Sequence, residues 1–303
     1  MKKSELKNIK ASSIALGTFD GIHLGHSKVI ENAVLCKDGE VPLILLFNEH
    51  PHKALYGKAP KRVITKNQQE SLLKHMGITP VYEDFSSIMN LNSEDFVIEI
   101  ARKYKVRQIS CGFNFHFGKN AAGDAMTLKQ ICDDNGIRLK VSGAISYDGL
   151  PISSSRIRSS LEKGDVLSAR NMLGRWFSYD FTIHESQKLG RKLGFPTINQ
   201  YFPPDFIVPE YGVYASFTVV NEKLFPSVTN IGMRPTIGDG VMGSETHIIG
   251  IDDNLYGENI LVSLTKKIRD EICFSSLEEL KNQIESDKQK ALSVWEEGNE
   301  KTN

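Results

Sequence analysis

The stretch GTFDGIHLGH, from Gly17 to His26, carries three glycines and two histidines directly after the apolar run 13–16. Glycines let the backbone turn tightly and approach a ligand, and a helix start offers unpaired N–H groups to an anion. Imidazoles at His23 and His26, in the first turn of such a helix, can donate to phosphate oxygens as negative charge builds up on them. The stretch therefore predicts a phosphate site; the alternative is a sharp turn with two surface histidines.

A second candidate for anion binding is ISSSRIR, residues 152–158. Its serines offer hydroxyl groups at an expected helix N-cap, and Arg156 and Arg158 follow in the first turn. Arginines at a helix start oppose the helix dipole unless an anion binds between them. A solvated helix start with incidental arginines is the alternative.

The second half of the chain contributes GRKLGFPTIN, residues 190–199. Gly190 and Gly194 free the backbone for close contact with a phosphate. The Thr197 hydroxyl and the Asn199 carbonyl oxygen are hard oxygen ligands of the kind that Mg²⁺ accepts. The alternative is a glycine-rich hairpin without a ligand.

These residues must be positioned by two different architectures. Up to about Gly149 the expected strands 13–16, 41–47, 80–82, 106–111 and 137–141 alternate with the expected helices 27–36, 67–76, 93–104 and 126–135. Such alternation predicts an α/β domain with a parallel sheet covered on both faces, and ligands beyond the carboxyl ends of its strands. GTFDGIHLGH follows the first of these strands.

From Trp176 the pattern changes to short strands with turn signals, at 177–183, 211–220, 224–231, 244–251 and 259–268. This pattern predicts a small antiparallel barrel, with loops at its mouth that carry the site. An apolar stripe at helical spacing from Phe274 to Trp295 predicts a terminal helix packed on the barrel. The joint is expected just before this half, which gives domains 1–174 and 175–303.

Composition limits the class of protein. Lys plus Arg and Asp plus Glu both number 37, so we expect no nucleic-acid partner and no anionic membrane surface. No apolar run reaches the roughly 18 residues that span a bilayer, and the first residues lack the apolar core of a secretion signal, so a cytoplasmic protein is expected. The four cysteines show no metal-ligand spacing and are predicted to be buried free thiols.

Four stretches in order resemble the nucleotidyltransferase module of bacterial bifunctional riboflavin kinase/FAD synthetases. They are GTFDGIHLGH, LFNEHPH at 46–52, CGFNFHFG at 111–118 with Gly123-Asp124, and ISSSRIR. The resemblance implies a Rossmann-like domain in which the FMN phosphate attacks the α-phosphorus of ATP, so that FAD forms and pyrophosphate leaves. Such a reaction needs alignment and charge stabilisation rather than a protein nucleophile.

The same resemblance implies roles for individual residues. His23, His26 and Arg158 would be catalytic, the histidines on the ATP phosphates and the arginine on the leaving pyrophosphate. The implied nucleotide contacts are Gly17, Phe19, Asp20, Gly25, Asn114, Ser154, Ser155 and Arg156. A carboxylate in such a loop can equally fix the turn by accepting from backbone N–H groups, and we prefer that role for Asp20.

The second half resembles riboflavin kinase. GRKLGFPTIN is similar to the GRxLGFPTxN signature of that family, and YGVY at 211–214, NIGMRPT at 230–236, NLYG at 254–257 and RDE at 269–271 follow in its order. The resemblance implies that Glu245 is the base for the ribityl 5′-hydroxyl; a solvated strand residue is the alternative. The implied nucleotide contacts are Gly190, Arg191, Gly194, Pro196 and Thr197, the Mg²⁺ ligands are Thr197 and Asn199, and the flavin contacts are Phe115, Asn230, Arg234, Tyr256 and Arg269. Phe115 and Tyr256 could also be ordinary packing residues.

The chain departs from the family pattern close to its expected phosphates. Asn48 and Glu49 replace the usual Asp-Pro, which adds a negative charge, and His116 stands where arginine is common. Phe181 and Ser186 occupy glycine positions of a flap, so we expect a stiffer or reshaped ATP loop.

Three functional hypotheses follow. The first is a bifunctional enzyme that uses ATP and Mg²⁺ to make FMN from riboflavin and FAD from FMN. The second keeps only one activity, and the third is a flavin- or nucleotide-binding sensor, against which the retained base and metal ligands argue. The expected partners are small molecules, with no nucleic acid and no membrane, and the expected state is a monomer or a weak homo-oligomer.

Overall fold

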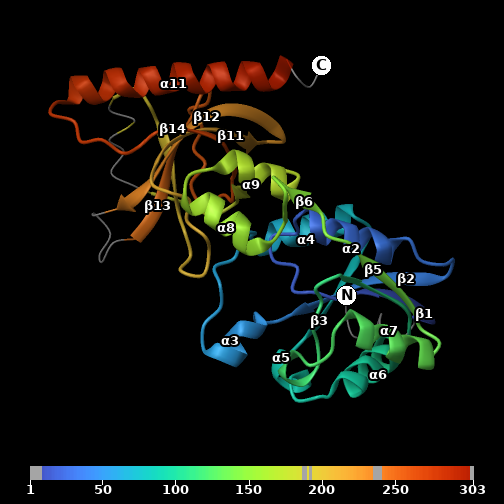
Figure 1. The fold of residues 1–303 in the computed structure, drawn as a ribbon. Helices are drawn as coiled ribbons and strands as arrows, with labels where there is room; N and C mark the ends of the chain where they lie inside the picture. Colours follow the sequence, from blue (N-terminus) through green and yellow to red (C-terminus); the bar gives the residue numbers. More distant parts are fainter. Residues whose placement is uncertain (1–8, 186–189, 191–192, 235–240, 301–303) are drawn as a thin grey trace. The chain divides into compact units, whose positions relative to one another are not determined.

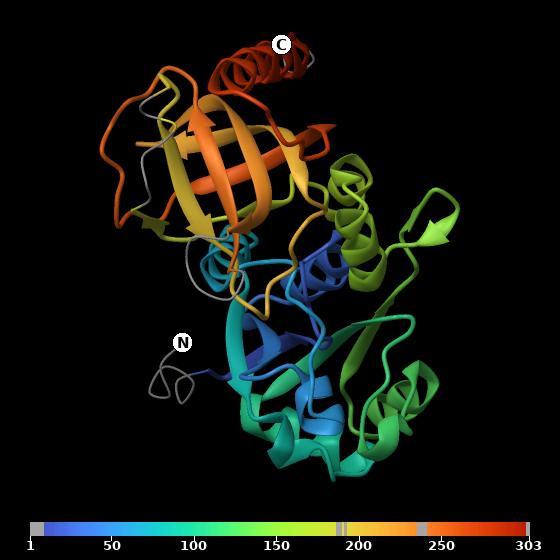
Figure 2. The same ribbon diagram turned by 90° about the vertical axis from the view of Figure 1, so that its left-hand side faces the viewer.

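The chain divides into two compact units, shown in Figures 1 and 2. The structure is a computed structural model that describes residues 9–185, 190, 193–234 and 241–300. The first unit comprises Met1–Pro60 and Lys66–Ser153, and the second comprises Lys61–Thr65 and Ser154–Asn303. The division therefore falls at Ser153/Ser154 rather than at the joint expected from the sequence. It does so because two helices before residue 174, α8 (Ser154–Glu162) and α9 (Val166–Leu173), pack together and α9 packs on a strand of the second unit.

The first unit is built on a parallel sheet, as predicted, and its strand order is β3-β2-β1-β4-β5. Its strands are β1 (Ala11–Ala15), β2 (Glu40–Phe47), β3 (Thr79–Glu83), β4 (Val106–Gly112) and β5 (Arg138–Ser142). The order reverses between β1 and β4, which both lie in the middle of the sheet. In sheets of this kind ligands bind at the reversal, beyond the carboxyl ends of the strands.

Helices cover both faces of this sheet. They are α2 (Leu24–Val34), α3 (Pro51–Tyr56), α4 (Lys66–His75), α5 (Phe85–Ile88), α6 (Ser93–Tyr104) and α7 (Ala125–Asp134), with a 3₁₀ turn η1 (Lys119–Ala121) and a hairpin of β6 (Ser146–Tyr147) and β7 (Leu150–Pro151). Helices α6 and α7 share one apolar cluster with Leu43 and Leu45, whereas α2 and α4 share another with Ile44 and Leu46. Successive side chains of β2 thus point to opposite faces, and both faces are apolar because both are covered. The short helices α3 and α5 are too brief for a helical period, and the sequence did not predict them.

The second unit contains an antiparallel sheet of seven strands in the order β8-β14-β11-β12-β13-β10-β9, curled into a half-barrel (Figure 2). Its strands are β8 (Ser178–Tyr179), β9 (Ile183–His184), β10 (Thr197–Tyr201), β11 (Gly212–Val220), β12 (Lys223–Arg234), β13 (Val241–Ile248) and β14 (Leu261–Arg269). The strand expected at 177–183 is broken in two, and its halves pair with opposite edges of the sheet. This segment therefore runs from one edge to the other and covers both. Strand β10 was not predicted.

Hydroxyl groups line part of the interior of the half-barrel. Thr229 Oγ1 lies 2.8 Å from Ser216 Oγ and 2.9 Å from Thr246 Oγ1, and all three residues are buried. Thr218 and Ser227 form a second buried pair, 2.7 Å apart. Small hydroxyl side chains fill a narrow interior, and pairing satisfies each buried polar atom.

The described residues of the second unit include the helices α8 (Ser154–Glu162), α9 (Val166–Leu173) and the terminal α11 (Leu277–Glu300). Ala291 of α11 packs in a cluster with Val213, Ala215 and Val228 on the outside of the sheet, which confirms the expected terminal helix. Leu277, which the stripe placed in the interface, is 62% exposed. The stripe is therefore buried only along the part of the helix that crosses the sheet.

The segment Lys61–Thr65 joins the second unit through main-chain bonds. Arg62 N donates to Asp205 O at 2.7 Å, and Ile207 N donates to Arg62 O at 2.9 Å. The Arg62 guanidinium also pairs with the Asp205 carboxylate at 2.9 Å. These bonds form a parallel bridge with the segment around Phe206.

The sequence predicted buried free thiols, and the structure confirms this for two of the four cysteines. All four cysteines are free; Cys111 and Cys132 are buried as predicted, but Cys36 is half-buried and Cys273 is exposed. Burial raises the pKa of Cys111 to about 12 and that of Cys132 to about 11, so both stay protonated. Among the described helices, we find none whose length and hydropathy would suit a membrane span.

A buried ion pair ties α11 to β14. Arg269 Nη2 and Nε lie 2.8 and 2.9 Å from the Oδ2 of Asp287, and Gln283 donates to the other carboxylate oxygen at 2.9 Å. Asp287 is only 1% exposed. Removal of one partner leaves the other charge buried, which costs far more than the loss of a surface pair.

We expect Asp287→Ala to lower the free energy of unfolding of the second unit by about 3 kcal/mol or more. Both tryptophans of the chain, Trp176 and Trp295, lie in that unit, so urea unfolding followed by tryptophan fluorescence reports on it. Lys290→Ala, an exposed change on the same helix, is the control and should stay within about 0.5 kcal/mol. Equal unfolding midpoints for the two variants would contradict the prediction.

Candidate active sites

The GTFDGIHLGH loop lies where the strand order of the first sheet reverses. Leu16, just past β1, donates its N–H to Ser110 O of β4 at 2.9 Å, and the loop continues from there into α2. The predicted position beyond the carboxyl end of a strand and at the start of a helix is therefore what the structure has.

His23 and His26 form a stacked pair at the start of α2. Their ring centroids are 3.6 Å apart with an interplanar angle of 14°, and His23 Nδ1 caps the helix by accepting from the His26 N–H at 3.2 Å. Because Nδ1 of His23 is an acceptor, a neutral His23 ring carries its proton on Nε2. Burial, and then the neighbouring His23, hold the pKa of His26 well below its ordinary value of 6.5. His26 Nδ1 is enclosed and has no hydrogen-bond partner within the described chain.

The loop before the pair has an unusual backbone. Phe19 and Ile22 have φ values of 49° and 39°, and Gly21 between them has 79°. Side-chain-bearing residues rarely adopt such values, and their clustering is typical of a site that holds a ligand. The Phe19 ring lies edge-on to His26 at 5.3 Å and so close to Gly17 that a side chain there would contact it at 3.1 Å. Gly25 makes the same kind of room for the His23 ring.

Side chains of β4 and β5 hold α2 and its C-cap by donating to their main-chain carbonyl groups. Ser110 donates to Val29 O at 2.9 Å, Gln108 to Asn32 O at 2.8 Å, and Lys140 to Leu35 O at 2.7 Å. Asn32 in turn donates to Ser142 Oγ at 2.9 Å. These bonds, together with apolar packing, set the helix start that carries the histidine pair.

The other predicted residues of the first unit lie at neighbouring strand ends. Asn114 is exposed just past β4, and Phe115 stacks on Phe117 at 5.5 Å and packs on the apolar core. Glu49, the added negative charge, pairs with Lys53 at 2.7 Å. The negative charge added by Glu49 is thus compensated by the Lys53 ammonium group.

Helix α8 carries the predicted serines and arginines, and it belongs to the second unit. It begins at Ser154, and Arg158 Nη2 lies 3.3 Å from Ser155 Oγ one turn away. Two of the residues predicted to act on pyrophosphate are therefore in contact.

The register of β10 against β13 brings the predicted kinase residues together. Asn199 is paired with Glu245, and Thr197 with His247 two residues along. Directly paired residues of antiparallel strands project to the same face, so Asn199, Glu245 and Thr197 share the outer face of the half-barrel. Asn230 of β12 pairs with Glu245 from the other side.

Oxygen ligands gather on this outer face. Asn230 Nδ2 donates to Glu271 Oε1 at 3.3 Å, whereas Asn230 Oδ1 is enclosed and accepts no hydrogen bond from any residue that the structure describes. Amide, hydroxyl and carboxylate oxygens fit a hard cation such as Mg²⁺, which takes further ligands from water and phosphates. The described residues hold no cluster of three or more His, Cys, Asp or Glu that would suit a transition metal.

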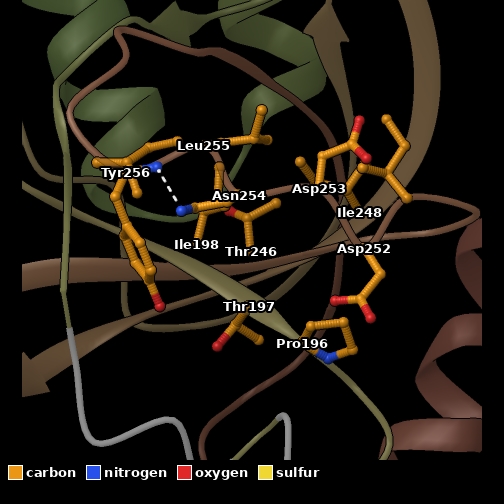
Figure 3. A pocket seen from close by; sticks show the side chains of 12 residues that line it. Pro196, Thr197, Ile198, Thr246, Ile248, Asp252, Asp253, Asn254, Leu255 and Tyr256 are labelled. Atoms are coloured by element: carbon orange, nitrogen blue, oxygen red, sulfur yellow. Dashed lines mark hydrogen bonds between the residues drawn. The ribbon is translucent and has the colours of Figure 1, made fainter.

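A pocket of about 530 Å³, part of it open solvent, lies beside the start of β10. Thr197 and Tyr256 line it, together with Pro196, Asp252 and Asp253, as Figure 3 shows. Two residues with different predicted partners, Thr197 for the nucleotide and Tyr256 for the flavin, thus line a single pocket.

Some predicted residues have other contacts or fall outside the described chain. The Arg269 guanidinium, a predicted flavin contact, binds Asp287 and lies 5.8 Å from the centre of the Phe274 ring. Phe181, expected to reshape the ATP loop, packs against Phe206 at 5.1 Å and Phe202 at 5.5 Å in an aromatic cluster. Gly190 and Gly194 both precede β10, and the Phe195 N–H donates to Gly190 O at 2.8 Å. Arg191, Ser186 and the side chain of Arg234 lie outside the described residues.

Comparison with known proteins relates both sites to one family. A family model described as FAD synthetase matches residues 5–156, and one described as riboflavin kinase matches residues 173–295. A bifunctional riboflavin kinase/FMN adenylyltransferase of Bacillus subtilis (strain 168) is 34% identical over 301 residues, 96% of this chain and 95% of its own. The chain belongs to the bifunctional riboflavin kinase/FMN adenylyltransferase family.

Other members of this family and a solved structure agree. The Escherichia coli (strain K12) protein of the same name is 30% identical over 286 residues, 90% of each chain. The crystal structure of a protein from Streptococcus pneumoniae that is named a macrolide-efflux protein has a TM-score of 0.85 and 26% identity, and it covers 94% of this chain and 95% of its own. That name describes the Streptococcus pneumoniae protein, and the likeness to it is one of fold.

The sequence prediction gave no role to several residues that lie beside the predicted ones. His247, Asp252 and Asp253 were not singled out, and Glu271 was noted only as part of the RDE stretch. The alternation of Glu245 and His247 along one strand could have revealed the first, because residues two apart share a face. Glu271 and the pocket aspartates depend on loop paths, which leave no periodic signal.

We expect the His26 ring to remain neutral in the folded protein at about pH 6, because burial lowers its pKa. ¹⁵N chemical shifts of the imidazole measure this, with the urea-unfolded chain as the control. The unfolded chain binds the extra proton, so this group makes the first unit less stable as pH falls below about 6.5, until the folded ring itself protonates. An imidazolium signal from folded protein at pH 6 would contradict the assignment.

Proposed function

We propose that the chain carries out both reactions of its family from two separate sites. It phosphorylates riboflavin to FMN with ATP, and it adenylylates FMN to FAD with release of pyrophosphate. The observation that carries the kinase half is the pairing of Asn199 with Glu245 inside the riboflavin kinase match. The stacked His23 and His26 inside the FAD synthetase match support the other half.

In the kinase reaction, Glu245 acts as the base that takes the proton from the ribityl 5′-hydroxyl as the phosphoryl group transfers. Thr197 and Asn199 hold Mg²⁺, which neutralises charge on the phosphates when bound. Gly190, Arg191, Gly194 and Pro196 contact the nucleotide, as the resemblance implies. The predicted flavin contacts Asn230, Arg234, Tyr256 and Arg269 remain part of this proposal. The enclosed Asn230 Oδ1 supports it, since a ribityl hydroxyl could donate to that atom.

In the adenylylation reaction, His23 and His26 donate to phosphate oxygens as charge develops, and the N–H groups at the start of α2 add to this stabilisation. Phosphate binding favours protonation of the His26 ring, whose pKa burial lowers in the free protein. Gly17, Phe19, Gly25 and Asn114 shape the nucleotide site, Phe115 contacts the flavin, and Asp20 fixes the loop. Ser154, Ser155, Arg156 and Arg158 of α8 hold pyrophosphate, and Arg158 lies outside both family matches.

The wider predictions remain part of the proposal. Equal numbers of basic and acidic residues support the absence of a nucleic-acid partner. Dependence on ATP favours the cytoplasm, and the oligomeric state is proposed to be monomeric or weakly self-associating. The two domains are assigned as 1–174 for adenylylation and 175–303 for the kinase, although α8 and α9 pack with the second unit.

Incubation of the pure protein with riboflavin, ATP and Mg²⁺ is expected to give FMN first and FAD later, resolved by chromatography. Both products are expected because each unit retains its proposed bases and anion donors. FMN alone, or FAD only from supplied FMN, would mean that a single half works. Flavin binding without either product would identify a sensor.

Variants should separate the two reactions. We expect Glu245→Gln and Asn199→Ala to reduce riboflavin phosphorylation by about 100-fold or more, because the base or a metal ligand is lost, while FMN adenylylation persists. His26→Ala should reduce FMN adenylylation while riboflavin phosphorylation persists. Glu222→Gln, an exposed glutamate in the turn between β11 and β12, and His75→Ala, an exposed histidine on α4, are the matched controls. FAD formation that survives His26→Ala would refute the role of the α2 start.

A further inference from the structure

His247 lies beside the kinase residues and has no part in the reactions described above. It follows Glu245 by two residues on β13, so both side chains project to the outer face of the half-barrel. Its direct partner on β10 is Thr197. The side chain is half-buried, and no pocket-lining role falls to it.

The imidazole makes a hydrogen bond to the main chain of the neighbouring strand. His247 Nδ1 lies 2.8 Å from the carbonyl oxygen of Pro196. A carbonyl oxygen can only accept, so Nδ1 is the donor and carries a proton. The ring also meets the edge of buried Phe195, with centroids 5.5 Å apart and an interplanar angle of 86°.

This contact bears on the start of β10. Among the described residues, β9 pairs with Asn199 and Gln200, and the ladder partner of Thr197 is His247 itself. Pro196 precedes the strand and has no N–H of its own to bond. The bond from His247 to the Pro196 carbonyl oxygen therefore restrains the peptide plane that joins Pro196 to Thr197.

That peptide plane sets the direction of a pocket-lining side chain. Pro196 and Thr197 both line the pocket that Tyr256 also lines (Figure 3). Rotation of the plane would turn the Thr197 hydroxyl away from its present direction, and displacements of about 1 Å are enough to impair a preorganised site.

From these contacts we propose that His247 is a positioning residue of the kinase site, which holds Pro196 and Thr197 in the geometry that binds the nucleotide phosphates. The proposal rests on the function assigned above to Thr197. It requires that the side chain at position 247 offer a hydrogen-bond donor at the place of Nδ1. It does not require a charge on the ring. An asparagine amide offers a donor near the position of Nδ1, the amide of glutamine lies one carbon further out, near the position of Nε2, and leucine has no donor.

The test compares His247→Asn with His247→Leu and His247→Gln in the full chain. Bound ADP with Mg²⁺ stabilises the folded second unit by an amount that depends on its Kd, and the fluorescence of Trp176 and Trp295 reports on that unit alone. The apparent Kd follows from the unfolding midpoint measured over a series of ADP concentrations. The same series without ADP records any loss of stability caused by the substitution itself.

We expect the apparent Kd for ADP with Mg²⁺, and the KM for ATP in riboflavin phosphorylation, to rise about tenfold in His247→Leu and His247→Gln and to stay within about threefold in His247→Asn. FMN adenylylation by the same samples should not change. If His247→Leu does not fold, His247→Gln carries the comparison.

Two results would overturn the proposal: wild-type affinity in the leucine and glutamine variants, or equal weakening in all three. Asn199→Ala, measured in parallel, separates this failure from that of the function proposed above. Loss of ADP binding in Asn199→Ala with normal binding in His247→Leu would remove only the role of His247. Normal binding in Asn199→Ala would remove the assigned kinase site.

Discussion

The pairing of β10 with β13 is the constraint on which the kinase site depends. Side chains alternate along each strand, so a slip of one residue would move Asn199 and Glu245 into the interior of the half-barrel. The interior prevents this slip. Gln200, fully buried one residue further on, donates to the carbonyl groups of Phe181 and Ile260 at 2.5 and 2.8 Å. Asn199 and Glu245 are thus placed on the outer face by neighbours that project into the interior.

The first unit positions its site by a different device. Helix α2 starts in a loop with positive φ angles at Phe19, Gly21 and Ile22, and such strain persists only where the surroundings enforce it. Ser110 and Gln108 donate to carbonyl groups of the helix, while its apolar side chains pack on the sheet. Polar bonds have directional geometry that apolar contacts lack, so this mixture fixes the rotation of the helix as well as its distance from the sheet.

The sequence predicted the long periodic elements and the residues at their ends, and it failed where the tertiary structure decides. The parallel sheet and the His23 site follow from alternation and from glycine spacing. Strand β10 was missed because the glycines and proline before Thr197 read as a loop, although Thr197 and Asn199 alternate as strand residues do. The prediction for Arg269 did not include Asp287, because nothing in the pattern indicates that this carboxylate lies against the guanidinium. Phe181 was read as a lost glycine, and its aromatic partners come from a segment beyond the turn.

The segment Lys61–Thr65 has a consequence for folding during translation. Asp205, which pairs with Arg62, is synthesised 143 residues later, on the order of ten seconds at ribosomal rates. Every strand of the parallel sheet has left the ribosome well before then, so that sheet can form while this short stretch still waits for its partners. The second unit is therefore complete only when it binds Lys61–Thr65, a segment synthesised long before. In a nascent chain stalled before residue 205, this segment would be exposed to proteases.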